Sequence, residues 1–367
     1  IDMHAHHHRE HKGIIPPHNF ETASYLAYGV TTTLDPAPTS TNLFPTAELI
    51  EAGQVIGPRV FGTGENITDG DSPYRNDISS YEVAEQTVKR LQSWGATAIK
   101  EYMQPRRIQR QWLDEAARKL GINVTAEGSL DLEHKLSMTM DGHTGFEHIT
   151  AYLRLYSDFT TFLGKANVVY SGTVVVAGAG AWGEEYFWQE SDVWRDDKQR
   201  RWMPWRQLIP HSRRHMERPV TDYPFPFMAE GVADIIAAGG YGAVGSHGQQ
   251  HGLASHWDIW IHAEGTGPMG ALEVASMHGA YFLGMQDDLG SIESGKLADL
   301  VVLNSNPLDN IRNTADIRFV MKGGRLWEAD TMNEIWPENK PFGDYYWVDP
   351  EMLRSDDRPV DYWDRKR

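Results

Sequence analysis

Short β-rich runs alternate along the sequence with segments of helical periodicity, and this alternation limits the possible folds more than any other feature. Eight strand-like runs lie at residues 1–6, 30–34, 59–62, 96–102, 123–126, 145–149, 167–177 and 242–246. Between them, segments such as 81–94 and 109–120 place apolar side chains on one helix face. Strands separated by helices form right-handed crossovers and parallel sheets. Eight repeats predict an α/β fold, a (β/α)8 TIM barrel whose active site lies at the carboxyl ends of the strands.

The pattern changes after the last barrel strand. On this change we divide the 367 residues into a barrel at 1–288, accessory β-sandwich strands at 289–337 and a C-terminal tail at 338–367. In the accessory part, 300–303 has the composition of a buried strand, and 319–326 has that of a hairpin bending near Gly323 and Gly324. The accessory sandwich is therefore expected to be partial and built from the C-terminal segment.

An insertion at about 183–229 interrupts the barrel pattern. It mixes tryptophans such as Trp188 and Trp202 with arginines, and it is longer than an ordinary loop. A connection of this length is often a lid over an active site. The alternative is a surface subdomain with cation–π contacts between these arginines and tryptophans.

Composition excludes several classes of function. The 51 acidic residues outnumber the 34 basic ones and give a formal net charge of −17, whereas a nucleic-acid backbone requires a basic face. No apolar run reaches the roughly 18 residues of a membrane span. Cysteine is absent, so any metal must be held by histidine, aspartate, glutamate or a modified lysine.

The first residues are rich in histidine. Six of the 16 histidines lie in the first 18 residues, and His4 and His6 are two positions apart on the first expected strand. Side chains two apart on a strand point to the same side, so both imidazoles can bind one cation. A tag remnant or a solvated strand end is the alternative, but a tag would be an uninterrupted run. Because neutral imidazole binds divalent metals readily, we expect a pair of metal ligands.

Ionisable residues also end four later strands. They are Lys100, Glu127, His148 and His247. Each is ambiguous alone: Lys100 is either a solvated strand-end lysine or a buried lysine modified to an anionic ligand, and a single strand-end histidine is often structural. Together with the amino-terminal pair, they occupy the ends of five expected strands, where a barrel collects its catalytic residues. This convergence predicts a metal site.

Seven motifs extend from residue 1 to about residue 337. They are IDMHAH (1–6), YGVTTTLDP (28–36), AGQVIGPRVFGTG (52–64), GATAIKEY (95–102), DGHTGFEHI (141–149), GSHGQQHGLASHW (245–257) and GSIESGKLADLVVL (290–303). With these motifs the sequence resembles the metal-dependent amidohydrolase superfamily. It is most similar to the imidazolonepropionase and prolidase-like branch, and in particular to the amidohydrolase part of proteins fused to a TolB-type β-propeller.

The resemblance implies a role for the strand-end residues that match the family pattern. His4 and His6 would bind one metal ion. Lys100 would be a carboxylated lysine that bridges two metal ions, and His148 would bind the second.

Two positions depart from that pattern. Glu127 stands where most relatives have a histidine, and His247 stands where they have the aspartate that takes a proton from the attacking water. His247 is then either the base, since its ordinary pKa of about 6.5 suits neutral pH, or a metal ligand, and Glu127 is a further candidate ligand. We expect one or two divalent ions, with zinc first and iron or manganese as alternatives.

The expected reaction is hydrolysis. A divalent ion lowers the pKa of water to about 7 and polarises a carbonyl group, so metal-activated water can cleave an amide or short peptide C–N bond without a protein nucleophile. Tyr102 and His143 are expected to stabilise the oxyanion. Arg106, Trp182 and His256 are expected to bind a small-molecule amide or peptide substrate.

The scaffold does not by itself fix the reaction. A lyase, an isomerase or an esterase on the same scaffold is the alternative within enzymes. A non-catalytic binding or scaffold protein with a degenerate site is a second alternative, suggested by the departures at Glu127 and His247.

Expectations about partners follow from the resemblance and from the first residue. The chain begins at Ile1 within strand-like sequence, so we expect a fragment of a longer precursor. Relatives build the accessory sandwich from both sides of the barrel, which implies that a missing N-terminal segment with propeller and sandwich strands, or another chain, covers the edge at 300–303. We expect a homo-oligomer in the bacterial periplasm or secreted, with the cytoplasm as the alternative, and no nucleic-acid partner.

Overall fold

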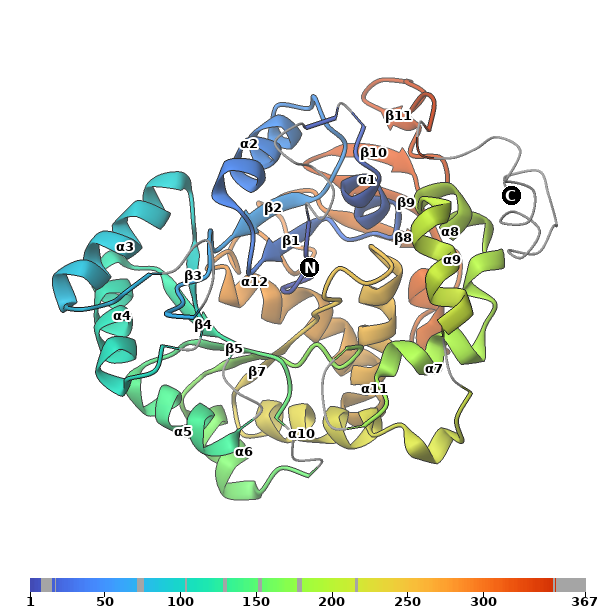
Figure 1. Ribbon diagram of the computed structural model, residues 1–367. Coiled ribbons are helices and arrows are strands. Elements are labelled where there is room, and N and C mark those ends of the chain that lie inside the picture. The colour runs from blue at the N-terminus through green and yellow to red at the C-terminus, as the bar shows by residue number, and fades with distance from the viewer. Residues whose placement is uncertain are drawn as a thin grey trace, which may run out of the picture.

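The computed structural model describes residues 1–7, 15–16, 18–70, 76–102, 104–127, 131–150, 154–176, 180–214, 217–345 and 347. In this part of the chain the central strands are parallel and form two sheets (Figure 1). In the first sheet, β1 (Thr32–Asp35) pairs with β2 (Arg59–Gly62). The second has the order β3-β4-β5-β6-β7, formed by β3 (Ala98–Glu101), β4 (Asn123–Ala126), β5 (Gly145–Glu147), β6 (Val169–Ser171) and β7 (Tyr241–Ala243). The prediction of an α/β fold with parallel strands is confirmed.

Backbone hydrogen bonds join the two parallel sheets on both sides. Residues 1–6 form a parallel bridge to β1, and the N–H of Met3 donates to the carbonyl of Val244, just after β7, at 2.7 Å. On the other side, the N–H of Ile67, which follows β2, donates to the carbonyl of Lys100 in β3 at 3.0 Å. The amino-terminal segment therefore lies between the first and last parallel strands.

Several of the expected strands are shorter than the sequence suggested, and two of them differ most. Of residues 167–177, the strand β6 takes only three, and the buried valines 174–176 form a turn that Thr173 enters with a φ of 43°. A continuous buried apolar run does not by itself distinguish a strand from a buried turn, because it has no alternation. Residues 1–6 are extended along both neighbours but form a single bridge to β1 instead of a full ladder.

Helices cover the outer side of the parallel strands (Figure 1). They are α2 (Ser40–Glu51), α3 (Tyr81–Trp94), α4 (Arg107–Leu120), α5 (Leu132–Asp141), α6 (Ser157–Lys165) and α10 (Phe225–Ala237). Local sequence explains their limits: the Ser80 hydroxyl accepts a hydrogen bond from the N–H of Val83 at 3.4 Å, and Gly95 ends α3 with a φ of 110°. The helices expected at 81–94 and 109–120 are confirmed. Within the described residues, each helix is too short or too polar to cross a bilayer.

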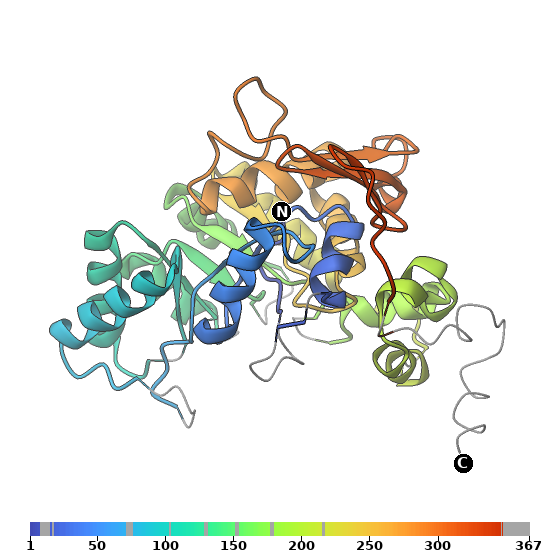
Figure 2. The same cartoon turned by 90° about the horizontal axis from the view of Figure 1, so that it is seen from above.

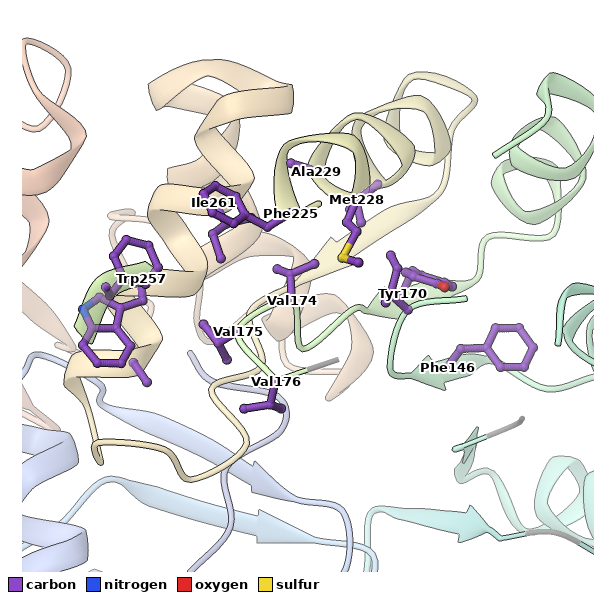
Figure 3. Close-up of a cluster of buried hydrophobic side chains, with 14 of the residues drawn as sticks. Phe146, Tyr170, Val174, Val175, Val176, Phe225, Met228, Ala229, Trp257 and Ile261 are labelled. Carbon is purple, nitrogen blue, oxygen red and sulfur yellow. The ribbon is translucent and has the colours of Figure 1, made fainter. Parts of the chain in front are cut away.

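A large apolar cluster fills the space between the sheet and helices α10 and α11 (Leu253–Glu273) (Figure 3). Phe225 and Met228 of α10 meet Trp257 and Ile261 of α11 there, beside Tyr170 of β6. α11 continues through a π-helical turn, η3 (Val274–His278), into α12 (Gly279–Phe282). The cluster fixes the helices that follow and precede β7, and so positions the loop after that strand.

The antiparallel sheet is separate from the parallel strands and lies beside α1 (Phe20–Ala27) (Figure 2). Its order is β11-β10-β9-β8, formed by β8 (Leu300–Leu303), β9 (Ile317–Lys322), β10 (Arg325–Glu328) and β11 (Glu334–Trp336). The hairpin expected at 319–326 is confirmed, with Gly323 and Gly324 at positive φ in its turn.

The strand β8 lies at an edge of this sheet, which corrects the expectation that it is buried. Val301 and Val302 are 41% and 43% exposed. They are exposed because β8 pairs on one side only, with β9. That a further strand covers this edge stays a prediction, as do the domain boundaries, and most of the predicted tail at 338–367 lies outside the described residues.

The insertion at about 183–229 is helical. It contains α7 (Gly183–Glu190), η1 (Val193–Arg195), α8 (Asp197–Trp202), α9 (Trp205–Arg214) and η2 (Val220–Asp222). Arg195 lies over the ring of Trp194 at 4.7 Å, and Arg200 lies 6.0 Å from the ring of Trp205. These are the cation–π contacts of the subdomain alternative, and a lid function stays a prediction.

Two phenylalanines of α10 allow a matched test of the apolar cluster. Phe225 is buried, whereas Phe227 is 37% exposed. We expect Phe225→Ala to lower the free energy of unfolding by about 3 kcal/mol or more, because it removes a buried ring and leaves a cavity. Phe227→Ala should change it by about 1 kcal/mol or less. Urea denaturation of both variants checks this, and equal losses would contradict the assignment of the core.

Candidate metal centre

Four imidazoles meet where the amino-terminal segment passes the ends of β5 and β7. We call His4, His6, His148 and His247 the four-histidine cluster. Nε2 of His4 lies 3.2 Å from Nε2 of His6, and neighbouring ring centroids lie 4.7 to 5.3 Å apart. One nitrogen each of His4, His148 and His247 lies within 4.8 Å of the others. The structure thus brings together four of the residues that the sequence singled out as metal ligands.

Oxygen atoms orient three of these rings. Each ring contacts its oxygen through Nδ1: His4 with the Glu147 carboxylate, His6 with Asp35 at 3.2 Å, and His148 with the Thr173 hydroxyl at 2.6 Å. An imidazole held at Nδ1 presents Nε2 on its opposite side, which is how outer-shell partners orient metal-binding histidines. The three contacts therefore direct Nε2 atoms toward one another.

Burial favours the neutral form of two of these rings. Burial and the nearby Lys100 lower the pKa of His4 well below its ordinary value and that of His148 to about 3. Neutral imidazole is the form that binds a metal. The 3.2 Å between Nε2 atoms of His4 and His6 is also close to the roughly 3.3 Å that two nitrogens have when both bind a tetrahedral zinc ion at about 2.0–2.1 Å. The donor set therefore fits a divalent cation.

Backbone strain accompanies the cluster. His148 and His247 adopt positive φ angles of 61° and 59°, a conformation that residues other than glycine rarely take. Both follow short strands, β5 and β7, and the left-handed turn at each aims the imidazole at the amino-terminal segment. Strain of this kind concentrates at functional sites, where the surrounding structure must hold it in place.

A charged pair lies next to the cluster. Nζ of Lys100, which is buried in β3, lies 3.0 Å from Oε2 of Glu127, and Oε1 of Glu127 lies 3.8 Å from Nε2 of His148. Burial alone would raise the pKa of Glu127, but Lys100, His148 and a hydrogen bond from Tyr102 hold it below its ordinary value. Burial and Glu127 raise the pKa of Tyr102, so its hydroxyl stays protonated. This side of the site thus offers a carboxylate and a phenol beside the imidazoles.

His143 lies in a different network. Its Nδ1 is 2.9 Å from Asp114 of α4, its Nε2 is 3.7 Å from Glu101, and its ring stacks on Phe146. Burial alone would lower the pKa of His143, but the two carboxylates raise it to about 9. The structure does not bring His143 to the four-histidine cluster, and its contacts are those of a buried charged group that links β3 to α4.

The three expected substrate-binding residues lie on different elements, and their role stays a prediction. Arg106 is exposed at the start of α4, and Trp182 is exposed just before α7. His256 is buried on α11, where Nε2 lies 2.8 Å from the carbonyl of Tyr28 and Nδ1 lies 3.1 Å from the Thr314 hydroxyl. Burial lowers the pKa of His256 to about 4, as expected for a neutral structural histidine.

Sequence reasoning missed the residues that orient the imidazoles. Asp35 and Glu147 stand inside the motifs at 28–36 and 141–149, which marked them as candidates, but the imidazole that each contacts depends on the strand register. Sequence reasoning also missed Lys135, whose Nζ donates to the backbone carbonyls of Glu147 and His148 at 3.2 and 3.0 Å. Its place inside an ordinary helical segment gave no signal.

The raised pKa of His143 makes protein stability depend on pH. A histidine whose pKa rises from about 6.5 to about 9 on folding contributes stability that is complete below about pH 6.5 and is lost as the pH rises through about 9. We therefore expect His143→Gln to lower the free energy of unfolding by up to about 3 kcal/mol near pH 6 and by much less near pH 10. Urea denaturation across this range measures the gap, and a gap that widens with pH would contradict the assignment.

Known proteins resemble this arrangement. The model of the amidohydrolase family matches residues 253–327, and no curated protein matches the sequence. A Xaa-Pro dipeptidase with bound methionine in its active site shares 20% identity over 84% of this chain and 77% of its own, with a TM-score of 0.62. A putative prolidase from Bifidobacterium longum shares 19% sequence identity over 91% of this chain and 79% of its own, with a TM-score of 0.62. The A. niger ochratoxinase shares 16% sequence identity over 95% of this chain and 84% of its own, with a TM-score of 0.63.

Identities this low show a shared fold, and the family match covers the end of the parallel core and the first three strands of the antiparallel sheet. The four-histidine cluster lies in the same fold, at the ends of its parallel strands. Residues 253–327 thus match the amidohydrolase family, and the similar solved structures show that the chain shares their fold.

Proposed function

We propose that this enzyme cleaves an amide or short peptide bond with a water molecule activated by a divalent metal ion. The observation that carries the proposal is the four-histidine cluster: imidazoles from three separate parts of the chain lie side by side, and burial keeps those of His4 and His148 neutral. Neutral imidazole nitrogens that lie this close to one another are a common ligand set for a divalent ion.

The scaffold we propose is a (β/α)8 barrel in which residues 1–6 supply the first strand. The hydrogen bonds from Met3 to Val244 and from Ile67 to Lys100 support this, because they join the parallel sheets at both open sides. In such a barrel the functional side chains gather at the carboxyl ends of the strands. His148 directly follows β5 and His247 lies just beyond β7, as this arrangement requires.

When bound, a divalent ion supplies a water molecule of lowered pKa and an electrophile for the carbonyl oxygen of the substrate. We assign His4, His6, His148 and His247 to hold the ion, and zinc fits this all-nitrogen set, with iron as an alternative. Glu127 is then the base. Its ionised carboxylate, whose Oε1 lies beside His148, would take a proton from the attacking water and return it to the leaving nitrogen of the substrate. The protonated hydroxyl of Tyr102 would stabilise the developing oxyanion.

Lys100 decides how many ions the site holds. An ammonium group at Lys100 pairs with Glu127 and leaves one ion in the four-histidine cluster. A carboxylated Lys100 would place a second anion beside Glu127, and a second cation would have to balance the two. We propose the single-ion form, and an intact mass that exceeds the sequence mass by one carbon dioxide would instead support carboxylation.

The similar structures guide the choice of substrate class. Two of them are described as a Xaa-Pro dipeptidase and a putative prolidase, which favours a dipeptide or a related small amide as the substrate of this chain. The narrower relationship to imidazolonepropionase-like and propeller-fused proteins, the export from the cytoplasm and the homo-oligomer remain proposals of the same kind.

Removal of the metal should separate an enzyme from a non-catalytic protein. We expect hydrolysis of a dipeptide and amide library to stop on chelation and to return when zinc is added. His148→Ala should weaken zinc binding by more than the roughly 10- to 100-fold typical of losing an outer-shell partner, because it removes a ligand. His18→Gln is the matched control, since His18 packs on Phe342 away from the cluster. A metal-free protein that ignores chelators would contradict the proposal.

A second variant tests the base. We expect Glu127→Gln to lower kcat by about 100-fold or more, because the amide cannot take a proton, while the zinc content of the protein stays unchanged. The control is Glu133→Gln on the exposed start of α5. Loss of zinc together with activity would show instead that Glu127 is a metal ligand.

A further inference from the structure

A buried lysine lies beneath the turn that carries His148. Lys135 of α5 is 0% exposed, and its Nζ donates to the backbone carbonyls of Glu147 and His148 at 3.2 and 3.0 Å. None of the roles proposed above uses this side chain. Its two acceptors are consecutive residues at the point where β5 ends and the chain turns into the metal centre.

The surroundings of Lys135 are unusual for an ammonium group. Besides the two carbonyls, the rings of Phe146 and Tyr170 face Nζ at centroid distances of 5.1 and 5.4 Å; both rings are labelled in Figure 3. Burying a cation is costly unless hydrogen bonds and nearby negative charge compensate for the lost water. An apolar side chain of the same length would avoid this cost, so packing alone does not explain a lysine here.

Lys135 contacts a two-residue segment, Glu147 and His148, and each of these residues contributes to the site. His148 turns into the cluster with a φ of 61°, which is a strained conformation for histidine. The side chain of Glu147 contacts Nδ1 of His4 and accepts a hydrogen bond from the Thr125 hydroxyl at 2.8 Å. A shift of this two-residue segment would therefore move one imidazole and release the orienting contact of another.

We propose that Lys135 is a positioning residue of the metal centre. Its Nζ donates hydrogen bonds to the carbonyl oxygens of Glu147 and His148, and these hydrogen bonds keep the His148 imidazole aimed at His4 and His247. The inference rests on the proposed metal-dependent function, because it gives Lys135 a part in binding the ion. Tyr170 supports the same segment from the other side, since its hydroxyl accepts a hydrogen bond from the N–H of Thr150 at 3.0 Å.

The test compares metal binding in Lys135→Met, which keeps most of the length of the side chain and removes its donors. The matched control is Lys165→Met at the exposed end of α6. The dissociation constant for zinc is measured by competition with a chromophoric chelator, and the visible absorption of the cobalt-substituted protein reports the ligand geometry. We expect Lys135→Met to raise the zinc Kd by about tenfold or more and to alter the cobalt spectrum, as loss of an outer-shell partner does.

A third variant separates positioning from bulk stability. Lys135→Gln retains N–H donors and should recover part of the zinc affinity and of the cobalt spectrum, whereas a purely structural effect would not follow the donors. Where Lys135→Met is not recovered in folded form, Lys135→Leu takes its place. A zinc Kd and a cobalt spectrum unchanged in the donor-free variant, or changed equally in Lys165→Met, would overturn the inference.

These outcomes are distinct from failure of the proposed function. A wild-type protein that binds zinc but hydrolyses no amide contradicts the proposed reaction and leaves the comparison of zinc affinities valid. An active wild-type enzyme whose zinc Kd does not depend on Lys135 contradicts this inference alone.

Discussion

The central physical constraint of the molecule is that buried and half-buried imidazoles from distant parts of the chain must lie side by side with their nitrogens correctly aimed. Aiming depends on contacts outside the cluster: Glu147 holds His4, Asp35 holds His6, and the Thr173 hydroxyl holds His148. Each of these oxygens comes from a parallel strand or from the turn that follows it. The parallel strands therefore position the imidazoles and the groups that orient them together.

The residues at the strand ends could be predicted from the sequence, because the alternation of β-rich and helical segments shows where each strand stops. Lys100, Glu127, His148 and His247 each follow or end a short β-rich run, and parallel strands bring such ends to one side. The partners of the imidazoles were less accessible to prediction. A carboxylate such as Asp35 shows its role only when the register of its strand against residues 1–6 is known, and a sequence does not state that register.

Residues on the outer side of the sheet were the hardest to place. His143 stands in a family-like motif, yet it points to Asp114 and Glu101 on the helical side, because it precedes β5 by two residues instead of following the strand. His256 follows the loop after β7 but lies on α11, whose periodicity turns it toward Tyr28 and Thr314. In both cases a shift of a few residues along the element moves a side chain to another layer of the fold.

The two departures from the family pattern make sense when considered together. The resemblance leads one to expect an imidazole at position 127 and a carboxylate at position 247, and this chain has the reverse, so the site keeps the same number of each group. A nitrogen of His247 lies within 4.8 Å of one of His4 and one of His148, where it would complete the nitrogen ligands of the proposed ion, and Glu127 lies 3.8 Å from His148. The carboxylate has moved to the strand end next to Lys100, whose charge keeps it ionised, and a carboxylate in that state can still accept the proton. An exchange that preserves charge and donor types at one site is what a working metal centre requires, whereas a degenerate site has no reason to compensate the first change with the second.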